Sequence, residues 1–151
     1  MNEQIFFNRP LFPAQLDMSH PLTRGLVGCW VMNENDPSGM RVWDSSPYQN
    51  HGLVTGAQGR WQGRDFDGVD DKISIPDHAS LKFGTGDFTV GVWIKTSQNP
   101  GVNVYPFFLA KEDEIATRKG YALLQWETND YITFLIEADT EVILTSTFAV
   151  N

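Results

Sequence analysis

The acidic residues near the end of the chain offer the most direct route to chemistry. Glu137, Asp139 and Glu141 stand at alternate positions, with Ala138 and Thr140 between them. On a β-strand, residues at i, i+2 and i+4 share one face, so three carboxylates would line a cleft. One carboxylate could then act as nucleophile and another as acid/base, which is the chemistry of glycoside hydrolysis.

The flanks of this acidic run favour a different structure. Residues 132–136 and 142–144 are mostly apolar or β-branched and have the composition of two paired strands. Residues 138–140 would then form the turn that joins them. We therefore expect a hairpin tip here, with no catalytic residues.

The other residues that could perform catalysis are scattered along the chain. His20, His51 and His78 lack the spacing of a zinc site, and Cys29 has no evident neighbouring base. Gly84-Thr85-Gly86 has the composition of a turn before a strand rather than of a phosphate-binding loop. These observations predict that the protein is not an enzyme.

Oxygen-rich loops offer a second kind of chemistry, the binding of a hard cation. Asp44 and Asn50 lie in a long polar loop, and Asp70 and Asp71 lie in an acidic turn. Carboxylate and amide oxygens suit calcium, so these four residues are the candidate ligands for Ca²⁺, the one cofactor that the sequence suggests. The alternative is that these side chains only hold turns by accepting hydrogen bonds from nearby backbone N–H groups.

Aromatic faces offer a third kind of chemistry, stacking on sugar rings. Residues 88–96 alternate strictly, which places Phe88 and Ile94 on one face of a strand and Trp93 on the other. Trp93 and Trp126 are therefore the candidate ligand-binding residues. The alternative is that the tryptophans belong to the core or lie beneath loops.

Composition and charge limit the partners. The chain has 151 residues, of which 41% are hydrophobic and 13% aromatic, which is typical of one globular domain. Its net charge of −8 argues against nucleic acid and anionic membrane as partners. One cysteine excludes an internal disulfide. No apolar run has transmembrane length and no secretory leader is visible, so we expect no membrane insertion and synthesis without a secretion signal.

The elements that must position these residues are predicted to be β-strands. In the acidic turn Phe66–Asp71, Gly68 permits a positive φ, and residues 72–75 then alternate as a short strand. Further strands are expected at residues 26–32, 88–96, 121–128, 131–137 and 141–147. Only residues 111–119 have helical composition. Closely spaced strands with so little helix predict an all-β, two-layer antiparallel sandwich.

The first 24 residues differ from the rest. Pro10, Pro13 and Pro21 interrupt short apolar clusters, which disfavours both a helix and a central strand. We therefore expect residues 1–24 to form an extended arm that docks through its apolar side chains, either on its own domain or on a neighbouring subunit. The docking residues would be Ile5, Phe6, Phe7, Leu11 and Phe12.

Four segments carry a resemblance to a known family. They are Gly25–Glu34, Trp43–Ser46 with Asn50–Gly52, Phe66–Asp71 with Ile73–Pro76, and Gly86–Lys95. In this order and spacing, they resemble the laminin-G-like and concanavalin-A-like lectin/glucanase modules, which are related to the pentraxins. The resemblance implies a jelly-roll β-sandwich over residues 25–151, calcium in loops of this sort, and carbohydrate binding as one function.

The resemblance covers only part of the family pattern. Such modules continue with further strands about where this chain stops, so we expect a domain that is incomplete at its C-terminus or completed by a partner. Residues 16–26 are also similar to the opening of laminin-G-like proteins of tailed phages.

That likeness implies a virion structural protein, either a capsid decoration or a tail-associated protein. It would lie on a virion or extracellular surface, with other virion or surface proteins and copies of itself as partners. A carbohydrate-binding adhesion module is the alternative, and a glycoside hydrolase of the same fold is the weakest case.

Overall fold

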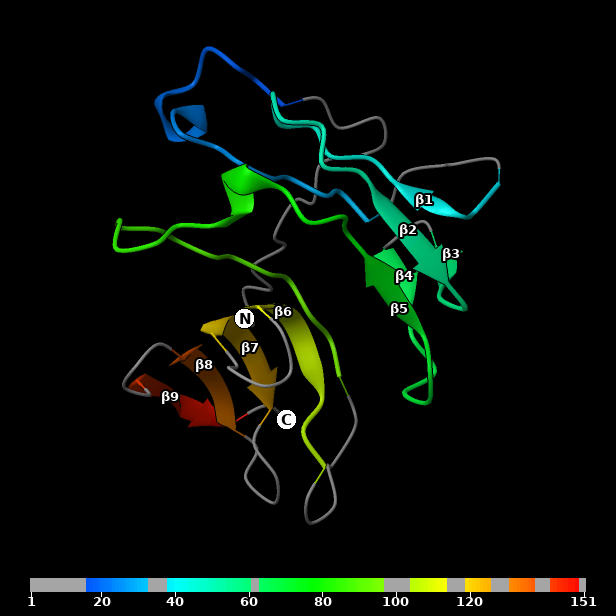
Figure 1. Ribbon diagram of the computed structural model, residues 1–151. Coiled ribbons are helices and arrows are strands. Elements are labelled where there is room, and N and C mark those ends of the chain that lie inside the picture. Colours follow the sequence, from blue (N-terminus) through cyan, green and yellow to red (C-terminus); the bar gives the residue numbers. More distant parts are fainter. Residues whose placement is uncertain are drawn as a thin grey trace, which may run out of the picture. The chain divides into compact units, whose positions relative to one another are not determined.

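The computed structural model describes most of the chain and divides it into two compact units, Met1–Gly86 and Asp87–Asn151. The described residues are 16–32, 38–60, 63–96, 104–113, 119–125, 131–137 and 142–149. Within them the regular structure consists of antiparallel strands and two short 3-10 turns (Figure 1). The prediction of an all-β chain is therefore confirmed.

The first unit contains a three-stranded sheet in the order β1-β2-β5. Its strands are β1 (Arg41–Val42), β2 (Gly52–Thr55) and β5 (Lys72–Ser74). Val42 lies opposite Gly52 and is buried. A Cβ atom on Gly52 would come within 2.6 Å of the Ile73 side chain, so glycine here lets Ile73 pack closely against the strand.

A hairpin and two 3-10 turns complete the first unit. The hairpin pairs β3 (Gln58–Arg60) with β4 (Gly63–Asp65). The turns are η1 (Pro21–Thr23) and η2 (Ala79–Leu81), and in each the preceding histidine caps the N-terminus, because its ring accepts a hydrogen bond from a backbone N–H.

The second unit contains a four-stranded antiparallel sheet whose strands follow one another in chain order. They are β6 (Phe107–Asp113), β7 (Lys119–Gln125), β8 (Tyr131–Glu137) and β9 (Val142–Ala149). Ala122 and Leu124 on β7 are almost completely buried. On the opposite face of β7, the ring of Tyr121 lies 5.2 Å from that of Phe88, so residue 88 packs against this sheet.

Three strands of the second unit lie where the sequence predicts strands. The expected strand 131–137 is β8, and those at 121–128 and 141–147 correspond to β7 and β9. β8 and β9 pair antiparallel, with Ile136 opposite Val142, so the predicted hairpin is confirmed. Residues 138–141 at its tip lie outside the described residues.

Three local predictions differ from the structure. Residues 26–32 form no strand, and only Trp30 makes an isolated bridge, to Asp44. Residues 88–96 belong to none of the strands, although their apolar residues alternate. An alternating pattern favours a strand only where a neighbouring strand is available for pairing. Residues 111–113 belong to β6 rather than to a helix, since pairing with β7 outweighs a weak local helix preference.

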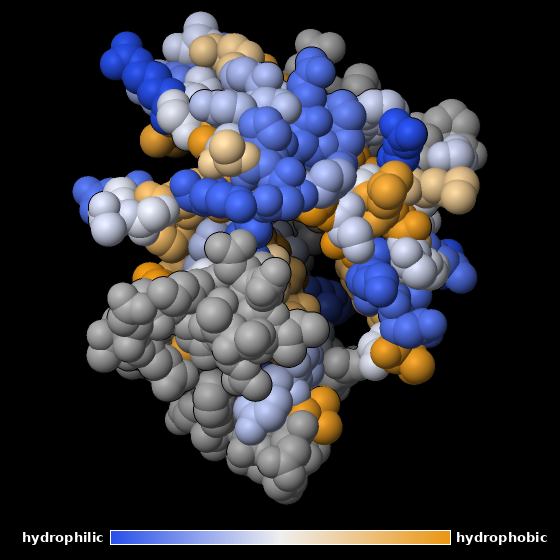
Figure 2. Space-filling model, in the orientation of Figure 1, coloured by the Kyte–Doolittle hydropathy of each residue, from blue (hydrophilic) through white to orange (hydrophobic). Residues whose placement is uncertain are grey.

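Among the described residues, no helix has the length and apolar character needed to cross a membrane. Most of the coloured surface in Figure 2 is hydrophilic, and hydrophobic residues are interspersed in it.

Candidate functional site

The best-organised polar site surrounds Asp44, which is 4% exposed. Its Oδ1 accepts hydrogen bonds from the backbone N–H groups of Cys29 and Ser46, each at 2.8 Å. Its Oδ2 accepts from the Ser46 hydroxyl at 2.7 Å and from the backbone N–H of Asn50 at 2.8 Å. Burial acts to raise the pKa of Asp44, but the hydrogen bonds from Cys29, Ser46 and Asn50 outweigh it and hold that pKa below its ordinary value.

Asn50 connects this loop to its surroundings. Its backbone carbonyl accepts a hydrogen bond from Trp30 Nε1 at 2.8 Å. Its side-chain amide donates to the Val27 carbonyl at 3.3 Å and to Ser80 Oγ at 3.0 Å. Asn50 is 7% exposed, so its polar atoms need these partners. Residues 44–51 are therefore held to two other segments of the first unit.

The geometry of Asp44 bears on the expected calcium site. Both carboxylate oxygens already accept two hydrogen bonds each from the chain itself. A calcium ion would have to replace several of these bonds, because it needs six to eight oxygen ligands with free lone pairs. The turn-holding alternative therefore describes Asp44 better than the ligand alternative does.

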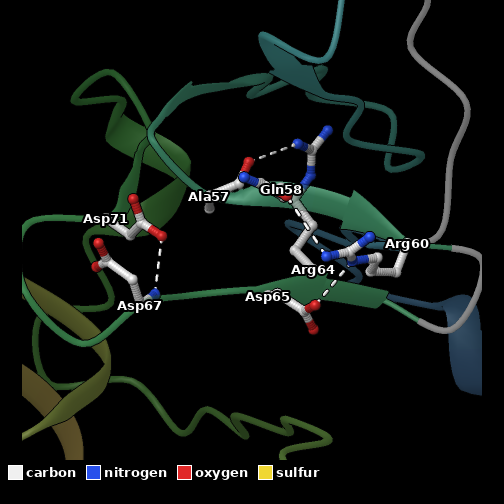
Figure 3. A network of polar contacts seen from close by, with 7 residues as sticks. All are labelled: Ala57, Gln58, Arg60, Arg64, Asp65, Asp67 and Asp71. Carbon is white, nitrogen blue, oxygen red and sulfur yellow. Dashed lines mark hydrogen bonds and ion pairs between the residues drawn. The ribbon is translucent and has the colours of Figure 1, made fainter.

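The acidic turn forms a separate cluster. Carboxylate oxygens of Asp67, Asp70 and Asp71 lie within 4.8 Å of one another. Asp71 Oδ2 accepts from the backbone N–H of Asp67 at 2.8 Å (Figure 3), and Asp67 Oδ1 accepts from the backbone N–H of Val69 at 2.8 Å. Gly68 has φ 76°, the left-handed value expected for it. The turn-holding alternative is therefore confirmed for Asp71, and Asp67 holds the same turn in the same way.

The donor set of this cluster suits a hard cation only in part. Three carboxylates supply the right kind of oxygen, but two of the residues, Asp67 and Asp70, are exposed. Gly56 shapes the same place, because it has φ 75° and a Cβ atom there would lie 1.7 Å from Asp71 Oδ1. Asp70 and Asp71 thus lie together as expected, whereas Asp44 is not a member of this cluster.

Arg64 on β4 is a residue that the sequence analysis missed. Its guanidinium donates to the carbonyls of Gly39 and Arg41, each at 2.9 Å, and to that of Ala57 at 3.3 Å. Figure 3 shows Arg64 beside Arg60, whose own guanidinium pairs with Asp65 at 2.8 Å. Arg64 therefore ties β4 to the start of β1. No local pattern predicts this role, because two of the carbonyls lie more than 20 residues earlier.

Of the two candidate sugar-binding residues, the structure describes Trp93. Trp93 is 86% exposed, which agrees with the expectation that it points away from the core. Trp43 is 40% exposed, and part of its ring contacts His51 at 4.6 Å between centroids. Trp126 and residues 1–15, which include the five predicted docking residues of the arm, lie outside the described residues, whereas residues 16–24 of the arm are described and contain η1.

Comparison with protein-family models, with curated proteins and with solved structures finds no match to this chain. The resemblance to the laminin-G-like modules therefore rests on the four sequence segments. Two of these segments meet in the structure, because Cys29 and Trp30 of the first donate hydrogen bonds to Asp44 and Asn50 of the second.

Proposed function

We propose that the chain is a non-enzymatic surface module of the laminin-G-like, concanavalin-A-like class, built as a two-layer jelly-roll sandwich. We propose further that it serves as a structural protein of a virus particle, as a capsid decoration or a tail-associated protein. The observation that carries the non-enzymatic part is the use of Asp44. This buried carboxylate accepts four hydrogen bonds from the protein itself, three from its own loop and one from Cys29 in the preceding segment.

The contacts between the family-like segments support the assignment to this class. Asp44 and Asn50 accept hydrogen bonds from the segment that contains Cys29 and Trp30, 15 to 20 residues earlier. These residues of the family-like segments thus act together to hold the polar loop against the preceding segment. A module whose polar residues maintain a rigid surface suits a structural or binding role rather than catalysis.

The structural role explains the remaining sequence features. An apolar, proline-rich arm would dock residues 1–24 on other virion or surface proteins or on copies of this chain, and an acidic domain would stay dissolved until it docks.

The docking role is tested by deletion of residues 1–24. The full chain should co-purify with density-gradient-purified particles at a fixed stoichiometry, and the deletion should leave it in the unbound fraction. A triple serine variant at Ile5, Phe6 and Phe7 should behave like the deletion. A matched variant with serine at Asn2, Glu3 and Gln4 should still bind, because it leaves the apolar residues in place. Full occupancy by the deleted form would contradict arm docking.

Carbohydrate binding is a second candidate, which the exposure of Trp93 favours. An aromatic ring that is 86% exposed offers a face on which a sugar ring can stack. A glycan array should then show binding that Trp93→Ala removes and that Leu22→Ala leaves unchanged. Leu22 is the matched control, since it is 83% exposed but has no aromatic ring. An array without any bound glycan would contradict this candidate.

A further inference from the structure

Residues 88–96 have the sequence of a strand but pair with none of the described strands. Figure 1 shows them as a line without an arrow between η2 and β6. Among the hydrogen bonds of the described part of the chain, none involves the backbone of residues 89–92. Backbone groups without a partner in their own chain bond water or remain available to another chain. The segment is therefore open to pairing with an added strand.

The segment is anchored at its start and exposed further on. The Phe88 ring lies 6.0 Å from that of Phe134 on β8. Val92, Trp93 and Ile94 are all exposed. Three consecutive exposed apolar residues are uncommon on the surface of a domain unless another molecule covers them. The second unit thus holds the beginning of the segment in place and leaves the rest uncovered.

The charges at the two ends of residues 87–95 suit pairing with a second copy of the chain. Antiparallel pairing with Gly91 at the centre places Asp87 of each copy opposite Lys95 of the other. Both residues are exposed, so their charged groups can reach this contact. Any other antiparallel register separates the two charges, because a shift moves every residue to a new partner. The charges therefore favour one register.

The same register brings apolar side chains together. Phe88 lies opposite Ile94 of the other copy, and Val90 lies opposite Val92. Alternation places all four on one face of the paired strands. This is the face through which Phe88 already packs on β7 and β8, so pairing would continue a packed face into the second copy.

Gly91 and Trp93 complement each other on the opposite face. A Cβ atom added at Gly91 would meet nothing within 4 Å, so the space beside this glycine is open. In the register centred on Gly91, Trp93 of one copy lies diagonally next to Gly91 of the other, a position within reach of a large ring. An aromatic ring that covers a glycine on the neighbouring strand stabilises such a pair. A sugar bound to Trp93 would compete with this packing.

We propose that residues 87–95 form an antiparallel strand pair with the same residues of a second copy, about a two-fold axis at Gly91. The contact is isologous, because the same surface serves both copies, and it closes at a dimer. It supplies the neighbouring strand that these alternating residues lack within the described part of the chain. The dimer does not depend on the proposed function.

Sedimentation equilibrium of the full chain at rising concentration tests the dimer, which should have twice the mass of the chain. Asp87→Lys alone replaces two opposite-charge pairs by two like-charge pairs, so it should raise the dissociation constant of the dimer by about tenfold. Lys95→Asp alone should do the same, and the double variant should restore the wild-type value. Asp70→Lys is the matched control, since it makes the same change of charge at an exposed residue of the first unit and should not raise the constant.

Hydrogen exchange provides a second readout. Alternate backbone N–H groups of residues 88–94 should be protected in the dimer, and Asp87→Lys should reduce that protection. A mass of one chain at every concentration would overturn the proposal, as would a dimer that both single charge reversals leave intact. Protection that Asp87→Lys leaves unchanged would also overturn it, because the segment would then pair within its own chain. Deletion of residues 1–24 should leave the dissociation constant unchanged, and loss of the dimer would assign the contact to the arm instead.

Discussion

Replacement of Asp44 by asparagine tests whether this carboxylate holds the polar loop. The substitution keeps the size of the side chain but turns one oxygen into an NH₂ group. Each oxygen of Asp44 now accepts two hydrogen bonds, so two bonds are lost and a donor is left facing other donors. A hydrogen bond to a charged group contributes about 1.5–3 kcal/mol, so the loss of two should lower the free energy of unfolding of Asp44→Asn by about 3–6 kcal/mol.

The assay is urea unfolding at pH 7, followed by tryptophan fluorescence, with Asp70→Asn as the control. Asp70 is exposed, so its substitution should change the free energy of unfolding by less than about 0.5 kcal/mol. Trp30 lies in the segment against which the loop is held and donates to the Asn50 carbonyl, so its fluorescence should respond to the loss. If Asp44→Asn stayed within about 1 kcal/mol of the wild type, the four hydrogen bonds would not support the loop as argued.

The same carboxylate predicts a pH dependence with a definite sign. The pKa of Asp44 is lower in the folded chain than its ordinary value of 3.8. Its stabilisation is therefore fully present above pH 3.8 and is lost as the pH falls through the folded-state pKa. Unfolding measured between pH 5 and pH 2 should show this loss in the wild type. Asp44→Asn should lack that part of the pH dependence, and an identical dependence in both proteins would refute the assignment.

Three further predictions test other parts of the chain. Gly56→Ala should lower the free energy of unfolding in urea by about 3 kcal/mol, because it adds left-handed backbone strain and a clash with Asp71. The control Gly39→Ala has the same strain at φ 66° but open space around the added Cβ, so it should lower that free energy by only about 1 kcal/mol. Thr133→Val should stabilise by about 1 kcal/mol, because the Thr133 hydroxyl is buried and has no hydrogen-bond partner among the residues that the structure describes; a loss of stability would contradict this reasoning. Burial raises the pKa of Tyr121, so absorbance titration should show one late-ionising tyrosine that Tyr121→Phe removes, and an unchanged titration curve would count against it.

The sequence predicts those features that depend on neighbouring residues. The acidic turn is an example, because Asp67 bonds the N–H of Val69 and Asp71 bonds that of Asp67, all within four residues. β8 is another, because its apolar and β-branched residues favour a strand wherever a partner is present. In both cases the information needed lies within a short stretch of chain.

Features that depend on distant partners were beyond local patterns. β6 ends in Lys111, Glu112 and Asp113, whose composition suggests a helix, and only pairing with β7 makes the strand. At the polar loop, the residue types pointed to oxygen ligands, but the burial of Asp44 and its bond to Cys29 arise from tertiary contacts. The contacts of Arg64 depend on the same kind of long-range information.

Arg64 connects two distant parts of the first unit, as a disulfide bond often does in a secreted domain. Its bond to the Gly39 carbonyl closes a loop of 25 residues, for which chain-entropy scaling gives a cost of about 3 kcal/mol. The chain has one cysteine and cannot form an internal disulfide. Because a guanidinium bound to carbonyls is indifferent to redox conditions, this connection holds equally in a reducing cytoplasm and in an oxidising exterior.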